Sequence, residues 1–263
     1  TLDGGKGAGG PLAVLFIAII AAEVGKAVSK ETKVDILVTP LVTIFTGVVL
    51  SAWWAPAIGT AASAVGDFVK WATVLQPFWM GILVSVVIGV ALTLPISSAA
   101  ICAAIGLTGL AGGAAVPGCC ANMVGFAVMS FRENKWGGLV SQGLGTSMLQ
   151  MPNIVKNPKI WLPAILTSAI TGPLATCVFH LEMNDPSGGV ASGMGTCGFV
   201  GQIGVYAGWV NDVAMGVKDS ITSFDWAGLI LISFVLPAIL CWAFGLFFRR
   251  IGWIKAGDLT LPQ

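Results

Sequence analysis

Charged side chains are scarce in this chain of 263 residues: only 10% are Asp, Glu, Lys or Arg, whereas 56% are hydrophobic. A soluble domain carries about 25% charged residues, so a water-exposed surface, and with it a soluble enzyme, is excluded. The formal net charge of +1 also excludes the polybasic surface by which proteins bind nucleic acid. The composition places the chain in a lipid bilayer.

Metal-binding motifs are missing as well. The chain has one histidine and six cysteines, and no two cysteines form a C-x-x-C pair. This pattern argues against a zinc site. The cysteines all lie in apolar or glycine-rich stretches, so we expect buried free thiols. We expect no metal, no cofactor and no catalytic residue in this chain.

What the sequence does contain is a series of long apolar runs, and these predict an all-α polytopic membrane protein. A spanning helix needs about 20 mostly apolar residues. Residues 56–76 are less apolar and include Asp67, Lys70 and Trp71, so we expect that helix to lie in the membrane interface. Because the chain starts at Thr1 rather than Met, we also expect further residues before it. The predicted spans cover residues 11–28, 36–54, 77–94, 160–181 and 226–248.

Two apolar segments, residues 97–130 and 186–209, are interrupted by glycine. The first contains Gly106, Gly109 and Pro117. Broken backbone at membrane depth is tolerated only where it is buried in protein or lines a wet cavity. We therefore predict two re-entrant helical hairpins rather than two straight helices.

The distribution of basic residues favours the hairpin interpretation. Positively charged loops face the cytoplasm. With the first segment as a hairpin, ten of the 13 Lys and Arg residues fall inside. With a full span there, only six do.

The two hairpin regions also resemble each other. Each has a Trp-led span, starting at Trp79 or Trp161, followed by a Pro-Ser step and a stretch of small residues. The topology gives them opposite orientations, which is typical of the inverted repeats of transporters. We predict an inverted repeat whose hairpins meet near the membrane midplane.

Polar residues at membrane depth are the candidate binding residues, because such residues are costly in lipid. The densest cluster precedes and enters the second hairpin. It suits a polyhydroxyl ligand or a proton relay; the alternative is an ordinary polar turn. The cluster comprises His180, Glu182, Asn184, Asp185 and Ser187.

Further candidates lie in and around the two hairpins. Closely spaced glycines let backbone groups approach a ligand, which singles out Gly193, Met194, Gly195 and Thr196, with Gln202 about two turns further on. A stripe at helical spacing can line a cavity or hydrogen-bond between helices; it is formed by Gln142, Thr146, Gln150 and Asn153. The first hairpin adds Ser97, Ser98 and Asn122.

Three sequence stretches carry a resemblance to a known family. They are Lys6-Gly7-x-Gly9-Gly10-Pro11 with the apolar run to Ile17, Lys33-Val34-Asp35-Ile36 with Thr39-Pro40, and Gly193-Met194-Gly195-Thr196 with Gly201-Gln202. With them the chain resembles the membrane IIC components of the phosphoenolpyruvate-dependent sugar phosphotransferase system. The resemblance covers most of the chain and is closest to the perfringolysin-regulator-like subgroup.

The resemblance implies a homodimeric sugar carrier in which one domain, bearing paired hairpins and the site, moves against a dimerising scaffold. Separate IIA and IIB proteins would phosphorylate the sugar. The Gly-Ile-Thr-Glu-Pro signature of glucose-type members is absent, and only Glu182 and Asp185-Pro186 stand near its place. The one histidine, His180, lies in a membrane context, so this chain is at most the membrane subunit of a sugar phosphotransferase.

The sequence therefore predicts a multi-pass carrier of a small polar solute, a sugar or sugar acid, in the cytoplasmic membrane of a bacterium. We expect a scaffold and dimerisation region at residues 1–76, a transport region at 77–225, and a last span with a cytoplasmic tail at 226–263. Three alternatives stay open. They are an ion- or proton-coupled transporter that uses Glu182, His180 or Asp212, a channel, and a membrane sensor of the solute.

Overall fold

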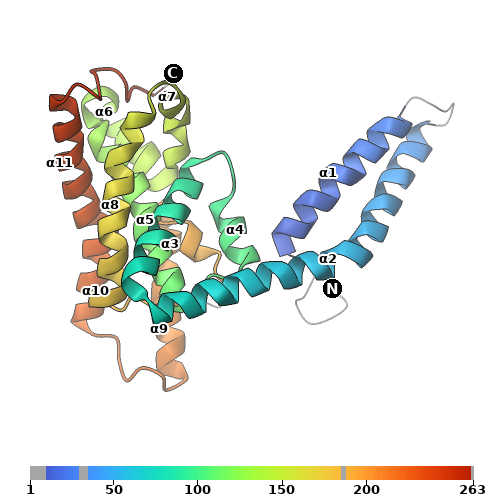
Figure 1. The fold of residues 1–263 in the computed structure, drawn as a ribbon, viewed down its shortest axis with the longest axis horizontal. Coiled ribbons are helices and arrows are strands. Elements are labelled where there is room, and N and C mark those ends of the chain that lie inside the picture. The colour runs from blue at the N-terminus through green and yellow to red at the C-terminus, as the bar shows by residue number, and fades with distance from the viewer. Residues whose placement is uncertain (1–9, 30–34, 185–187, 262–263) are drawn as a thin grey trace. The chain divides into compact units, whose positions relative to one another are not determined.

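The computed structural model describes residues 10–29, 35–184 and 188–261, and it confirms the all-α prediction. Within these ranges the only β pairing is an isolated bridge between Gly109 and Met183. The α-helices, shown in Figure 1, are α1 (Gly10–Val28), α2 (Asp35–Leu75), α3 (Pro77–Thr93), α4 (Ser98–Ala104), α5 (Gly109–Met129), α6 (Phe131–Val140), α7 (Met151–Lys156), α8 (Leu162–Pro173), α9 (Val200–Ala214), α10 (Ser223–Ile230) and α11 (Leu236–Arg250).

Shorter helical turns join several of these helices into longer rods. Three are π-helical: η1 (Ser141–Gly145), η4 (Leu174–Val178) and η7 (Leu231–Val235). The others are the 3₁₀ turns η2 (Ser147–Gln150), η3 (Pro158–Trp161), η5 (Ala191–Gly193) and η6 (Cys197–Phe199). Continuous helix therefore covers Pro158–Val178 and Ser223–Arg250.

In the described part of the chain, four helices have the length and composition to cross a membrane: Asp35–Leu75, Gly109–Met129, Pro158–Val178 and Ser223–Arg250. Helix α3 is a shorter apolar helix. These elements match the predicted spans at 36–54, 77–94, 160–181 and 226–248. The first predicted hairpin contains α4, a non-helical link at residues 105–108, and α5. Its re-entrant path, like the inverted repeat, stays a prediction.

The predicted span at residues 36–54 and the predicted interfacial helix at residues 56–76 are not separated by a break. A single helix of 41 residues, α2, contains both Pro40 and Pro56, and it is bent partway along its length (Figure 1). A proline removes one backbone hydrogen bond and bends a helix more often than it ends one in an apolar setting. The predicted span and the predicted interfacial helix are thus parts of one helix.

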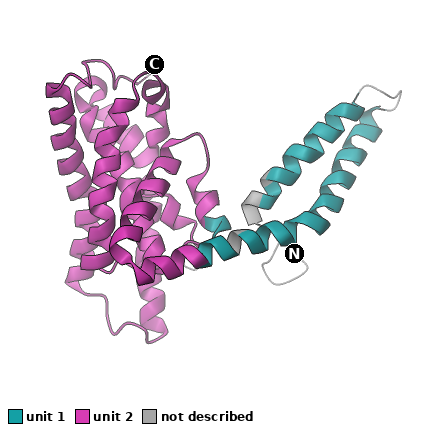
Figure 2. Cartoon of the chain, viewed as in Figure 1, with its two compact units in different colours: residues 1–67, 103–105 teal, residues 68–102, 106–263 magenta. Residues whose placement is uncertain are grey.

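Two compact units make up the chain (Figure 2). In the first, residues 1–67 with 103–105, Ala13 and Ile17 of α1 pack on Ala55 of α2. A groove of small and apolar side chains runs between the two helices, lined among others by Ala18, Gly47 and Ser51.

The second unit, residues 68–102 and 106–263, holds the polar candidates that the structure describes. Helix α5 is its centre and packs against α3, α8 and α11. Small residues allow this close packing: a Cβ on Gly118 would stand 1.8 Å from the carbonyl oxygen of Ser85. The Ser85 hydroxyl donates to the carbonyl of Ser168 at 2.9 Å, which ties α3 to α8.

Candidate functional site

The second glycine-interrupted segment brings non-helical backbone into the interior of the second unit. From Gly188 to Phe199 it runs through turns and the 3₁₀ turns η5 and η6 before α9 begins. Ala191, Ser192 and Gly193 are buried, as is Thr196. Buried backbone of this kind needs partners for its polar groups, and the neighbouring helices supply them.

The first hairpin region provides several of these partners. The Ser98 hydroxyl at the start of α4 donates to the carbonyl of Gly193 at 2.6 Å. The Cys119 thiol of α5 lies 3.8 Å from the carbonyl oxygen of Ser192. The structure therefore brings together the two glycine-rich segments that the sequence singled out.

Thr196 closes the other side of this junction. Its hydroxyl donates to the carbonyl of Gly143 at 2.5 Å and lies 3.6 Å from the sulfur of Met123. Gly143 lies in the last turn of the π-turn η1, which ends at Gly145, and carbonyls in the last turn of a helix have no partner within it. The junction thus joins α4, α5, η1 and the segment before α9.

Two buried polar side chains lie beside the junction. The Gln202 amide nitrogen contacts the sulfur of Cys120 at 3.4 Å, but its Oε1 is unpaired within the described ranges. The Ser233 hydroxyl of η7 lies against the same thiol, a weak hydrogen-bond acceptor, and has no other partner in the part of the chain that the structure describes. Buried polar atoms normally find a partner, so these two are available to a bound ligand or water.

Asn122, also on α5, is the centre of a separate network. Its Oδ1 accepts from the hydroxyl of Thr93 at 3.1 Å and from the indole nitrogen of Trp161 at 2.9 Å. The Thr93 hydroxyl also lies 2.8 Å from that of Ser147. Thr93, Asn122 and Ser147 are fully buried. Asn122 thus ties α3, α5 and η3 together.

The predicted cluster before the second hairpin lies at the start of α5. The bridge between Gly109 and Met183 holds the segment in an extended conformation, which turns Leu181 and Met183 inward and leaves Glu182 exposed. The Asn184 amide donates to both oxygens of Asp212 at 3.1 Å and lies 3.4 Å from Glu182. Asp212 is buried on α9.

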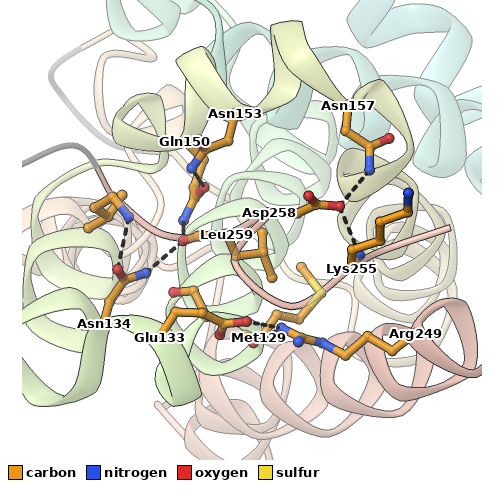
Figure 3. Close-up of polar contacts among 12 residues, drawn as sticks. Met129, Glu133, Asn134, Gln150, Asn153, Asn157, Arg249, Lys255, Asp258 and Leu259 are labelled. Carbon is orange, nitrogen blue, oxygen red and sulfur yellow. Dashed lines mark hydrogen bonds and ion pairs between the residues drawn. The ribbon is translucent and has the colours of Figure 1, made fainter. Parts of the chain in front are cut away.

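The stripe residues Gln150 and Asn153 bind the C-terminal tail (Figure 3). The Gln150 amide donates to the carbonyl of Leu259 at 3.0 Å and to Oε1 of Gln142 at 2.9 Å. The Asn153 amide donates to the carbonyl of Thr260 and to Oε1 of Gln150, both at 2.8 Å. We call residues 251–261 the C-terminal tail. The side chains of Gln150 and Asn153 thus donate hydrogen bonds to main-chain carbonyls of this tail.

Further amide side chains hold the same tail. Asn134 donates to the carbonyl of Leu259 at 2.7 Å and accepts from the backbone amide of Leu261 at 2.9 Å. Asn157 donates to the carboxylate of Asp258 at 2.8 Å. Beneath the tail, Arg249 pairs with Glu133 at 2.9 Å (Figure 3). This end of the unit is a clamp for the tail.

The structure therefore separates the predicted binding residues into groups. Ser98, Gly193, Gly195 and Thr196 meet at the junction, with Gln202 next to it, whereas Asn122, the Asn184 cluster and the Gln150–Asn153 pair lie in other networks. Ser97 and His180 are exposed and Met194 is half-buried. Asp185 and Ser187 lie outside the described residues.

Sequence reasoning did not single out Thr93, which contacts Asn122, or Cys120, which contacts Gln202. It also missed Ser147 and Ser233, which contact Thr93 and Cys120 in turn. A threonine, serine or cysteine in an apolar helix is common, so its type alone carries no signal. Cys120 lies next to Cys119 and one turn before Val124 on α5. These sequence neighbours do not indicate that a polar side chain contacts the Cys120 thiol.

Over the same described ranges, no group of three His, Cys, Asp or Glu side chains is placed to hold a metal ion. Comparison with known proteins gave one positive result. A family model described as "Phosphotransferase system, EIIC" matches residues 4–261. Neither the curated proteins nor the solved structures gave a match.

Proposed function

Because the chain belongs to the EIIC family of the phosphotransferase system, and is thus a multi-pass membrane sugar transporter, we propose that its sugar binds at the junction of the two glycine-interrupted segments. Family membership implies a sugar substrate and IIA and IIB partner proteins in general. The proposal adds the place of binding in this chain and the residues that contact the sugar.

The observation that carries the proposal is the unpartnered Oε1 of Gln202, next to buried non-helical backbone, with the Ser233 hydroxyl against the same Cys120 thiol that Gln202 contacts. Sugar hydroxyls both donate and accept hydrogen bonds, so an amide oxygen and a hydroxyl are suitable partners. The backbone of Gly193–Thr196 lies beside them; its carbonyls already accept one hydrogen bond each, and a carbonyl oxygen can accept a second. Ser98, whose hydroxyl donates to the carbonyl of Gly193, would line the opposite side.

The remaining predicted residues have places in the same scheme. His180, Glu182, Asn184, Asp185 and Ser187 would form the outer approach to the site, where a carboxylate and an imidazole meet the incoming sugar. Transport would proceed by alternating access, with the site region moving as a rigid body between the two membrane faces. We assign that movement to residues 77–225, and the scaffold and dimer contact to residues 1–76.

A homodimer is supported by the groove in the first unit. Small side chains along it, including Ala18, Ala21 and Gly47, would let a helix of a second copy approach closely.

A second candidate function is favoured by one observation. Asp212 is a buried carboxylate whose side-chain partner in the described part of the chain is the neutral amide of Asn184. A carboxylate of this kind suits coupling to a proton or cation. Uptake driven by a pH gradient without any phosphoryl donor would favour this function over phosphoryl coupling.

The test of the proposed site is Gln202→Ala. A thermal-shift screen of the purified protein against monosaccharides, disaccharides, sugar alcohols and sugar acids identifies a ligand, and calorimetry then measures its affinity. Losing one hydrogen bond to a buried ligand costs about 1–3 kcal/mol, so we expect affinity to fall about tenfold or more. Gln76→Ala, at an exposed position before α3, is the control. Unchanged affinity in Gln202→Ala, with the control also unchanged, would exclude this site.

A further inference from the structure

A groove of about 210 Å³ opens at the end of the second unit where α5 ends and α6 begins. Its wall is made by Val128, Phe131 and Leu139 on one side and by Trp242 and Leu246 of α11 on the other. Trp242 is 53% exposed. The groove is therefore an apolar channel on the surface that a membrane protein presents to lipid, with an aromatic side chain at its edge.

Two arginines line the same groove, and only one of them is neutralised. Arg249 pairs with Glu133 at 2.9 Å and donates to the carbonyl of Met129 at 3.2 Å. Arg132 is exposed and makes no ion pair or hydrogen bond with the residues that the structure describes. The groove thus carries one uncompensated guanidinium at its rim.

The groove lies at the end of the unit where α11 finishes with Arg249 and Arg250. The distribution of basic residues makes this end cytoplasmic, which puts Arg132 at the level of the lipid headgroups. The cytoplasmic leaflet is rich in anionic lipids, and basic pockets between helices on this side bind their headgroups.

We propose that this groove binds an anionic phospholipid, with one acyl chain along Val128, Leu139 and Leu246 and the phosphate on Arg132. A guanidinium matches a phosphate bidentately, whereas apolar walls match a lipid chain and give nothing to a soluble phosphate compound. The acyl chain of a zwitterionic lipid would fill the same groove, but the positive charge of its choline would be repelled by the Arg132 guanidinium that binds the phosphate.

The experiment measures lipid binding to the purified full chain by native mass spectrometry and by thermal shift. Phosphatidylglycerol and phosphatidylcholine with identical acyl chains are compared on the wild type, on Arg132→Gln and on Arg250→Gln. We expect the wild type and Arg250→Gln to prefer phosphatidylglycerol by about tenfold, because hydrogen bonds to charged groups are strong. We expect Arg132→Gln to bind the two lipids equally.

Two further arms separate the acyl-chain contact from the headgroup contact. Leu139→Trp fills the groove, so binding of both lipids should fall. Soluble sn-glycerol 3-phosphate should not displace the lipid. Equal binding of the two lipids by the wild type, a preference that survives in Arg132→Gln, or displacement by glycerol phosphate would each overturn the proposal.

Discussion

Gly195 takes a left-handed backbone conformation, with φ at +54°, where the non-helical segment touches α5. A Cβ at this position would stand 2.6 Å from Cβ of Cys119 and 2.9 Å from its carbonyl carbon. No L side chain fits both the conformation and the space, so the close approach of this segment to α5 depends on glycine.

We therefore predict that Gly195→Ala destabilises the protein by about 2–5 kcal/mol. About 1–2 kcal/mol of this comes from the left-handed backbone, and about 1–3 kcal/mol from overpacking. Gly216→Ala is the matched control, because Gly216 also has a positive φ, +71°, but no atom within 4 Å of the added Cβ. Thermal unfolding in detergent measures both. Equal losses in the two variants would show that α5 does not restrict this segment.

At the residue scale, the sequence could identify polar side chains but not their partners. Ser98 and Gly193 lie 95 positions apart, and no periodicity connects them. Gln202 could be selected because helical spacing places it near the glycines. Spacing also singles out Gln150 and Asn153, but their partners are main-chain carbonyls of the tail. Every residue has a carbonyl, so no side-chain pattern could reveal that contact.

At the element scale, hydropathy predicts the apolar helices because lipid leaves backbone groups no other partners than those inside a helix. It fails where a helix tolerates an unfavourable residue, as α2 does at Pro56. It also fails where apolar residues are held in turns. The stripe that includes Gln142, Gln150 and Asn153 has helical spacing, but these residues are divided among η1, η2 and α7, since Gly143 and Gly145 weaken helix formation there.

The C-terminal tail is the element whose role depends most on long-range contacts. It lies across the end of the unit that carries α6 and α7 (Figure 1), and Asn134 both donates to it and accepts from it. We predict that Asn134→Ala loosens the tail, because the tail then loses two hydrogen bonds. Amide hydrogen exchange over residues 255–261 should accelerate about tenfold or more.

The control for the tail is Asn211→Ala. Asn211 belongs to α9, a helix that lies at the other end of the unit from the tail (Figure 1). Its substitution should leave exchange in residues 255–261 at the wild-type rate. If Asn134→Ala also leaves that exchange rate unchanged, then the contacts of Gln150, Asn153 and Asn157 hold the tail without Asn134. The double variant Asn134→Ala, Gln150→Ala then tests whether the clamp as a whole holds the tail.

At the scale of the whole molecule, the sequence predicted a membrane carrier because composition and charge distribution are properties of the entire chain. Arg132, Lys159 and Arg249 all lie at the end of the second unit that carries the clamp and the groove. There Arg249 pairs with Glu133, and the Lys159 amine lies 5.1 Å from the centre of the Trp253 ring. The loop between α9 and α10 lies at the other end (Figure 1). A single membrane orientation thus accounts for most of the basic residues of this unit.

This orientation can be measured with single cysteines in a variant whose native cysteines are replaced. Lys156→Cys reports the clamp end, and Asp219→Cys reports the loop between α9 and α10; both positions are exposed. The positive-inside rule predicts that a membrane-impermeant maleimide labels only Asp219→Cys in intact cells and labels both after permeabilisation. The opposite pattern would place the tail and the arginine-lined groove outside the cell.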